Sequence, residues 1–274
     1  MRFSYVVPIM VLVVFITTYC TKSNVKETKE YITSKNEKAL SMIKSIEVIN
    51  SNSASSFKME FIVEGKFKGK KNFKSLGKAF FTKEPRRMMI IFYDYVFKSP
   101  LTIMAQDGDN IKFYFPVEKK LYLDKATKIN FKSYTDLDLD YFFVSTLTMG
   151  MIPIIKNYSI KQSLTEKDGK DKENKESFLI LENDYQFQTI VMKNSIPEKI
   201  LIINKVTKEK YEFYMENPYY KSKTLYYKSI RFYSQATGDR MSIRFKSIKH
   251  NAKIRKKEIT EIKPDKGVKI ERIN

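Results

Sequence analysis

The sequence is poor in the residues on which many enzymes depend. Its 274 residues include one histidine, one cysteine and no tryptophan. A chain with so few imidazole and thiol groups cannot build a zinc site of the usual His/Cys kind or a histidine-dependent catalytic triad. His250 stands in a polar stretch near the end of an expected strand, so we expect it at the surface. These absences predict a protein that is not an enzyme and holds no metal or cofactor.

Two common ligand-binding motifs are also missing. No glycine-rich phosphate loop occurs in the sequence. Asp136, Asp138 and Asp140 alternate as in a calcium loop, but Tyr141 and Leu147 stand where an EF-hand needs glycine and glutamate. Capping of a following helix explains these aspartates better. Catalysis by carboxylates alone stays open, because paired acidic residues leave no spacing signature.

Negative charge is scarce, and the formal net charge is +20. This excess favours anionic partners, either lipid headgroups or nucleic acid, unless the lysines form only a solvated coat. Hydrophobic residues make up 42% of the chain, with 20 Phe and 18 Tyr. A folded core built largely from strands is therefore expected.

The N-terminus has the pattern of an export signal. Arg2 precedes an apolar run from Tyr5 to Ile16 that is too short to span a bilayer comfortably. The pattern resembles a bacterial lipoprotein signal, in which Cys20 becomes the lipidated first residue, although Tyr19 replaces the usual small residue. An uncleaved anchor and plain secretion are the alternatives. In each case the mature chain works outside the cytoplasm, which argues against nucleic acid as a partner.

We divide the chain into a signal peptide (1–19), a polar tether (20–33) and one α+β domain (34–274). Ser34 and Glu37 have the spacing of a capping box, which predicts a helix over 34–50. The expected apolar face of this helix consists of Leu40, Ile43, Ile46 and Ile49.

Strict alternation then predicts a long strand at 57–67, with one buried and one mostly wet face. The run "RRMMIIFYDY" is apolar on both faces, so we expect cover on both sides of that strand. A second helix is expected over 139–149, and turns are expected at Asn217-Pro218 among other sites. The other expected strands are 73–82, 86–95, 101–106, 110–116, 119–123, 127–131, 156–164, 178–184, 187–193, 198–205, 208–216, 225–234, 240–249 and 257–263.

Three local motifs resemble the bacterial lipoprotein carriers of the LolA/LolB superfamily. "GKAFFTKEPRRM" at 77–88 resembles that family's strand ending in a proline beside a basic residue. "DGDNIKFYFP" at 107–116 and "EIKPDKGVKIERI" at 261–273 resemble two further family segments. The matches are in the family's order and are spread over residues 55–273, almost the whole mature domain.

The resemblance implies a large curved antiparallel sheet, an unclosed β-barrel covered by a few helices. The apolar cavity of such proteins receives acyl chains of lipoproteins in transit. Whether a partner carrier protein delivers them stays open from the sequence. Lipidated Cys20 implies an anchored member in the cell envelope, expected at the outer membrane facing the periplasm. We expect the cavity to be lined by Phe57, Met59, Phe61, Val63, Ile111, Phe113 and Phe115.

The loop "DYVFKSP" at 94–100 places Val96 and Phe97 between two strands. It could contact the membrane, as an acceptor would, or it could be a turn whose Phe97 packs back onto the sheet.

Three functions remain open from the sequence. The chain could be an anchored carrier or acceptor of acyl chains. It could be an envelope lipoprotein that uses the same fold as a protein-binding scaffold, or an enzyme that acts on envelope lipid or glycan. The apolar stripe does not separate the first two, because a filled core and a cavity wall have the same pattern.

Overall fold

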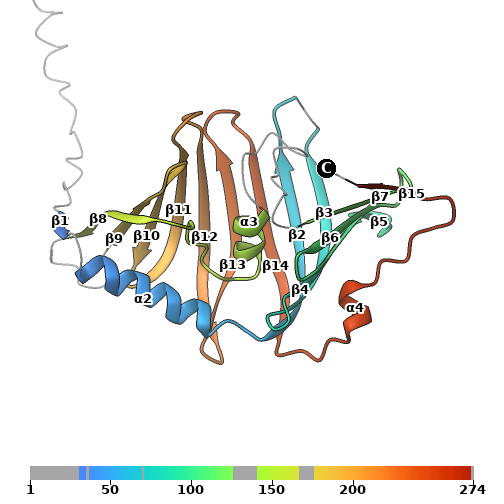
Figure 1. Ribbon diagram of the computed structural model, residues 1–274, viewed down its shortest axis with the longest axis horizontal. Coiled ribbons are helices and arrows are strands. Elements are labelled where there is room, and N and C mark those ends of the chain that lie inside the picture. Colours follow the sequence, from blue (N-terminus) through green and yellow to red (C-terminus); the bar gives the residue numbers. More distant parts are fainter. Residues whose placement is uncertain (1–30, 35–36, 70, 126–140, 167–175, 273–274) are drawn as a thin grey trace, which may run out of the picture.

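The computed structural model describes residues 31–34, 37–69, 71–125, 141–166 and 176–272. They form one 15-stranded sheet, in which the neighbouring strands are antiparallel except for β7 and β15. Its outermost strands, β1 and β15, do not pair with each other, so the sheet curves without closing. The predicted fold class, a large curved unclosed sheet with a few helices, is confirmed (Figure 1).

The sheet has two halves that meet where β14 pairs with β2. We call the strands on the β2 side the first half and those on the β14 side the second half. The first half contains β2 (Ser56–Lys66), β3 (Phe73–Thr82), β4 (Arg87–Asp94), β5 (Pro100–Asp107), β6 (Asn110–Phe115), β7 (Lys120–Lys125) and β15 (Lys269–Arg272). The second half contains β1 (Tyr31–Ser34), β8 (Ser159–Glu166), β9 (Glu176–Glu182), β10 (Gln186–Lys193), β11 (Ile196–Asn204), β12 (Lys210–Lys221), β13 (Thr224–Ser234) and β14 (Arg240–His250).

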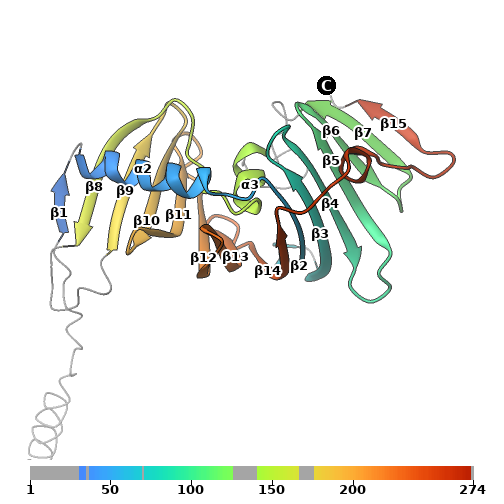
Figure 2. The ribbon, with the colours of Figure 1, turned by 90° about the horizontal axis from the view of Figure 1, so that it is seen from below.

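Helix α2 (Glu37–Ser51) runs across the second half (Figure 2). Its buried residues Ala39, Met42, Ile43 and Ile46 pack with apolar residues of β9 to β13. The prediction that Leu40 belongs to this buried face is wrong, because Leu40 is 56% exposed. The buried stripe begins at Ala39, and the next residue of a helix points about 100° away from it.

Strand β1 extends the sheet into the region predicted to be the polar tether. Its four residues pair antiparallel with β8, from Tyr31 opposite Glu166 to Ser34 opposite Ser163. The second helix, α3 (Tyr141–Thr148), lies within the span predicted for it, close to the junction of the two halves. The predicted strand at 127–131 lies outside the described residues.

The first half is covered on both faces, as the apolar run in β4 predicted. Met88 and Ile90 face the inner cluster, on the side of the sheet that carries α2 and α3. Met89 and Ile91 face the outer side, where they pack with Ile259 of helix α4 (Lys256–Thr260).

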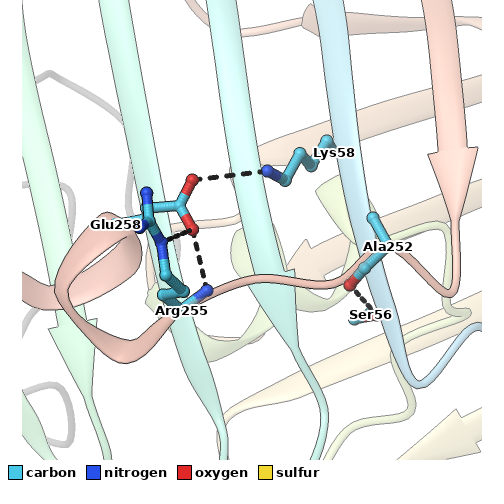
Figure 3. Close-up of polar contacts among 5 residues, drawn as sticks. All are labelled: Ser56, Lys58, Ala252, Arg255 and Glu258. Atoms are coloured by element: carbon cyan, nitrogen blue, oxygen red, sulfur yellow. Dashed lines mark hydrogen bonds and ion pairs between the residues drawn. The ribbon is translucent and has the colours of Figure 1, made fainter.

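Helix α4 contradicts the strand predicted at 257–263. The backbone N–H of Arg255 donates to Glu258 Oε2 at 2.9 Å and starts the helix (Figure 3). Ile259 is buried against β4 and β5. This hydrogen bond from Arg255 lowers the pKa of Glu258 to about 2, and the Arg255 guanidinium assists. The strand was predicted wrongly because the spacing of Ile259 and Ile262 fits both a short strand and one helical turn.

The segment that contains Ala252 and helix α4 is fixed to β2 by two polar contacts. Lys58 Nζ lies 3.5 Å from Glu258 Oε1, and Ser56 Oγ donates to Ala252 O at 2.8 Å (Figure 3). The segment that leads from β14 to α4 is therefore held against the outer face of the first half.

The turn predicted at Asn217-Pro218 is also wrong. Strand β12 continues to Lys221, and Pro218 pairs opposite Tyr227. Asn217 adopts a φ of 53° within the strand, and the chain turns at Ser222 and Lys223. Asparagine tolerates this left-handed conformation, so a turn-like dipeptide can stand inside a strand.

The burial of α2 predicts different costs for two truncations. Ile46→Ala removes a fully buried side chain and should lower the free energy of unfolding by about 2–5 kcal/mol. Leu40→Ala, on the exposed side of the same helix, should change it by no more than about 0.5 kcal/mol. Chemical denaturation of both variants measures the difference, and equal losses would contradict this placement of α2.

Candidate functional site

The inner face of the first half is the apolar surface on which the sequence placed the cavity. Six of the predicted lining residues are buried there and Phe115 is partly buried, all within one cluster. Along β2, the side that holds Phe57, Met59, Phe61 and Val63 carries no charged side chain. The structure thus brings the seven residues together.

A glycine opposite Phe61 shapes this surface. Gly77 is the register partner of Phe61 on β3, and a Cβ on Gly77 would lie 2.2 Å from the Phe61 ring. The ring therefore lies over the bare backbone of β3. Its edge contacts are Phe92 at 6.0 Å and Phe245 at 6.4 Å between ring centroids. These contacts extend the apolar wall from β4 to β14.

Several wall residues were missed in the sequence. They are Phe81, Met88, Ile90 and Met104 on neighbouring strands, and Met149 just after helix α3. In β4 both faces are apolar, so alternation could not show which residues turn inward. The register of β4 against β3, with Met88 opposite Phe81, supplies that information. Methionine is flexible and polarisable, so a wall rich in it adapts to ligands of variable shape.

The turn between β3 and β4 holds both inner helices. Arg86 donates from a guanidinium nitrogen to Ser145 Oγ of α3 at 3.0 Å. Lys83 Nζ donates to the carbonyl oxygens of Asn50 and Ser51, at 3.2 and 3.3 Å, at the end of α2. A cation at this place complements the negative end of the helix dipole.

The segment after α3 is tied to α2 as well. Asn50 Nδ2 donates to Ile152 O at 2.9 Å, and Ile152 N donates to Asn50 Oδ1 at 2.8 Å. Phe143 and Leu147 of α3 pack in the cluster of the second half, whereas Met149 packs in that of the first. The α3 segment therefore bridges the two apolar clusters and forms part of their cover.

The turn between β4 and β5 exposes the residues predicted to contact a membrane. Val96 is 72% and Phe97 83% exposed, so Phe97 does not pack back onto the sheet. Hydrogen bonds hold the backbone of this turn, since Asp94 Oδ1 accepts from the backbone N–H groups of Val96 and Phe97 at 2.8 and 2.7 Å. A fixed turn thus presents two apolar side chains to the surroundings.

A polar groove of about 810 Å³ lies elsewhere, on strands at the centre of the sheet. None of the seven residues predicted to line the cavity belongs to it. Its lining is Glu64, Gly65, Lys66, Asn72, Phe73, Lys74, Tyr214, Arg231, Phe232, Tyr233, Arg240, Met241 and Ser242.

The site offers little for acid–base or metal chemistry. Within the described ranges, no group of three or more His, Cys, Asp or Glu side chains could hold a metal ion.

His250 is half-buried rather than at the surface as predicted, and its ring lies 6.4 Å from that of Tyr226. Cys20 and the aspartates at 136, 138 and 140 lie outside the described residues. No helix in the described part is long and apolar enough to cross a membrane.

Known structures identify the fold. No protein-family model and no curated protein matches the sequence. A LolA superfamily protein from Nitrosomonas europaea is similar over 80% of this chain and 97% of its own, with 10% identity and a TM-score of 0.55. The chain has a LolA/LolB-like fold. A putative outer membrane lipoprotein-sorting protein domain from Vibrio parahaemolyticus is similar over 79% of this chain and 96% of its own, with 12% identity and a TM-score of 0.58.

A third similar structure is that of a DUF1329 family protein from Desulfovibrio piger. It is similar over 80% of this chain and 95% of its own, with 11% identity and a TM-score of 0.56. The three similarities cover nearly all of the solved chains, so the LolA/LolB-like architecture accounts for most of the sheet described above.

The Arg86–Ser145 contact predicts a role in holding α3. Arg86→Met keeps the length of the side chain but removes its donors, so amides of α3 should exchange hydrogen up to about tenfold faster. Arg87→Met is the matched control, because Arg87 pairs instead with Asp107 at 2.7 Å. Hydrogen exchange with mass spectrometry measures both, and equal effects on α3 would contradict the assignment.

Proposed function

We propose that the protein is an envelope lipoprotein that binds acyl chains of lipoproteins or other lipids on the inner face of the first half. The observation that carries the proposal is the apolar inner surface of β2 and β3, with Phe57, Met59 and Phe61 on a LolA/LolB-like sheet. Solved proteins that share this fold include a putative outer membrane lipoprotein-sorting protein domain, which supports a role in lipid handling.

Transfer of this kind needs no bond chemistry. A methylene group exposed to water costs about 0.8 kcal/mol, so an acyl chain must pass from one apolar environment directly to another. An inner wall of Phe and Met offers such an environment. The α3 segment, held by Arg86, would act as a cover that yields when cargo enters.

Anchoring would follow from acylation of Cys20. One acyl chain holds a protein to a bilayer only marginally, whereas two or more hold it stably. The bacterial lipoprotein modification attaches two or three chains, so the tethered domain would remain at the membrane of the cell envelope. The lysine excess would add attraction to anionic leaflets.

The exposed Val96 and Phe97 would contact the membrane surface during transfer. Apolar side chains on a fixed turn lose little conformational freedom on insertion, because the backbone is already held by Asp94. Cargo would leave or enter the inner face while this turn touches the bilayer.

The absence of tryptophan from the chain allows a direct test of acyl binding. In Phe115→Trp, the only indole would lie at the partly buried end of the apolar wall. A fatty acid brominated along its chain should quench this fluorescence at stoichiometric concentration. Phe187→Trp is the control, because Phe187 lies on β10, far along the sheet, with Lys205 over its ring. Quenching of neither protein, or of both equally, would contradict the proposal and leave the protein-binding scaffold as the better account.

A second reporter tests membrane contact. In Phe97→Trp the emission should shift to the blue when vesicles of phosphatidylcholine and phosphatidylglycerol are added, because the indole leaves water. Tyr220→Trp is the control, since Tyr220 is 58% exposed but near the β12–β13 turn, at the opposite ends of the strands. A blue shift of the Tyr220→Trp emission alone would contradict the proposal, because it would place the membrane contact at the opposite ends of the strands.

A further inference from the structure

The polar groove lies on the face of the sheet opposite the apolar wall. Glu64 and Lys66 alternate along β2 with the inward residues Val63 and Gly65, so they point outward. Lys66 is opposite Arg240, and Glu64 is opposite both Lys74 on β3 and Ser242 on β14. The groove therefore occupies the outer side of the junction between the two halves, and acyl binding on the inner face does not use it.

Positive charge dominates this groove. Its lining includes four cationic side chains, Lys66, Lys74, Arg231 and Arg240, and one carboxylate, that of Glu64. Lys74 lies 3.0 Å from Glu64, and Arg231 pairs with Glu216. The hydrogen bond from Lys74 lowers the pKa of Glu64, so this carboxylate stays charged and paired with Lys74. Among the described residues, Lys66 and Arg240 have no ion-pair partner.

The two unpaired cations are direct cross-strand neighbours. Arg240 of β14 is the register partner of Lys66 of β2. Like charges directly opposite each other destabilise a sheet by a few tenths of a kcal/mol up to about 1 kcal/mol. An anion bound between them would turn this repulsion into attraction, so the arrangement is unfavourable unless a ligand occupies it.

Aromatic rings hold the arginines in place. The guanidinium carbon of Arg240 lies 5.4 Å from the ring centroid of Tyr233, and that of Arg231 lies 5.5 Å from Tyr214. A guanidinium stacked on a ring keeps its N–H edge available for two parallel hydrogen bonds to an oxyanion. The groove thus offers preorganised donors suited to a phosphate group.

The groove adjoins the turn that exposes Val96 and Phe97. Lys74 Nζ lies 4.4 Å from the ring centroid of Tyr95, which belongs to that turn. On the other side, Lys68 N donates to Asp239 Oδ1 at 2.6 Å and joins the β2–β3 turn to the β13–β14 turn. A membrane that touches the apolar turn would bring its phosphate layer next to the groove.

We propose that this groove binds the phosphate group of an anionic membrane lipid, with Lys66 and Arg240 as its principal ligands. The proposal rests on the proposed contact of the β4–β5 turn with a membrane, but not on transfer of acyl chains. It assigns the outer face a separate role, which is to orient the domain on an anionic leaflet.

The test compares two double variants with the same loss of charge. The groove variant is Lys66→Gln/Arg240→Gln, and the control is Lys221→Gln/Lys223→Gln, with both residues exposed near the β12–β13 turn. Sedimentation with vesicles of phosphatidylcholine and phosphatidylglycerol, in about a 3:1 ratio, should show about 30-fold weaker binding for the groove variant. The control should change by less than about twofold, and vesicles of phosphatidylcholine alone should bind all proteins weakly.

Equal losses in the two variants would overturn the proposal, because they would show diffuse attraction without a site. A second binding measurement, with soluble glycerol 3-phosphate, distinguishes a lipid phosphate from a free phosphate. If glycerol 3-phosphate binds through Lys66 and Arg240 while vesicle binding is the same in both variants, the lipid assignment is wrong. Because the Phe97→Trp reporter measures insertion of the apolar turn separately, failure of the groove and failure of membrane contact give different results.

A charge reversal adds a readout of stability. Lys66→Glu would place opposite charges across β2 and β14, so the midpoint of thermal unfolding should rise by up to about 3 °C. The same variant should lose vesicle binding. A loss of binding together with a lower midpoint would contradict the idea that the like-charge pair is kept for a ligand.

Discussion

The structure depends on one constraint, which is that so wide a sheet has a large apolar inner face that must be kept from water. Helix α2 covers the second half through Ala39, Met42 and Ile46. The first half carries an equally apolar surface. Phe143 and Leu147 of α3 pack against the second half, whereas Met149, just after α3, packs in the cluster of the first half. Both apolar clusters lie on the inner side of the curved sheet, and the proposed function uses the cluster of the first half.

Polar contacts then decide how the cover is held. A few side chains near the β3–β4 turn reach both helices, with Lys83 at the end of α2 and Arg86 at α3. Hydrogen bonds to charged groups contribute about 1.5–3 kcal/mol each, so these contacts fix the ends of both helices to the β3–β4 turn. The outer face of the sheet is covered differently. Ile259 of α4 covers the outer side of β4 and β5, and α4 does not reach the groove at the junction of the two halves.

The sequence predicted those parts of the fold in which one periodicity dominates. Alternation in β2 identified Phe57, Met59, Phe61 and Val63 as one face, and turn residues separated most of the strands. Prediction from the sequence failed where two patterns coincide. Ile259 and Ile262 fit a strand as well as a helical turn, and Leu40 fits the helix spacing but lies beside the true stripe. The groove could not be predicted, because the opposition of Lys66 and Arg240 depends on the pairing of strands that are distant in the chain.

The central claim is that acyl chains occupy the inner face of the first half. Its most direct test is mass spectrometry of lipid extracted from an exported Cys20→Ala chain, which carries no acyl chains of its own. The account predicts co-purified acyl lipid in about equimolar amount, displaced by an added fatty acid that quenches Phe115→Trp. A folded chain that carries no lipid and takes up none from vesicles would contradict it.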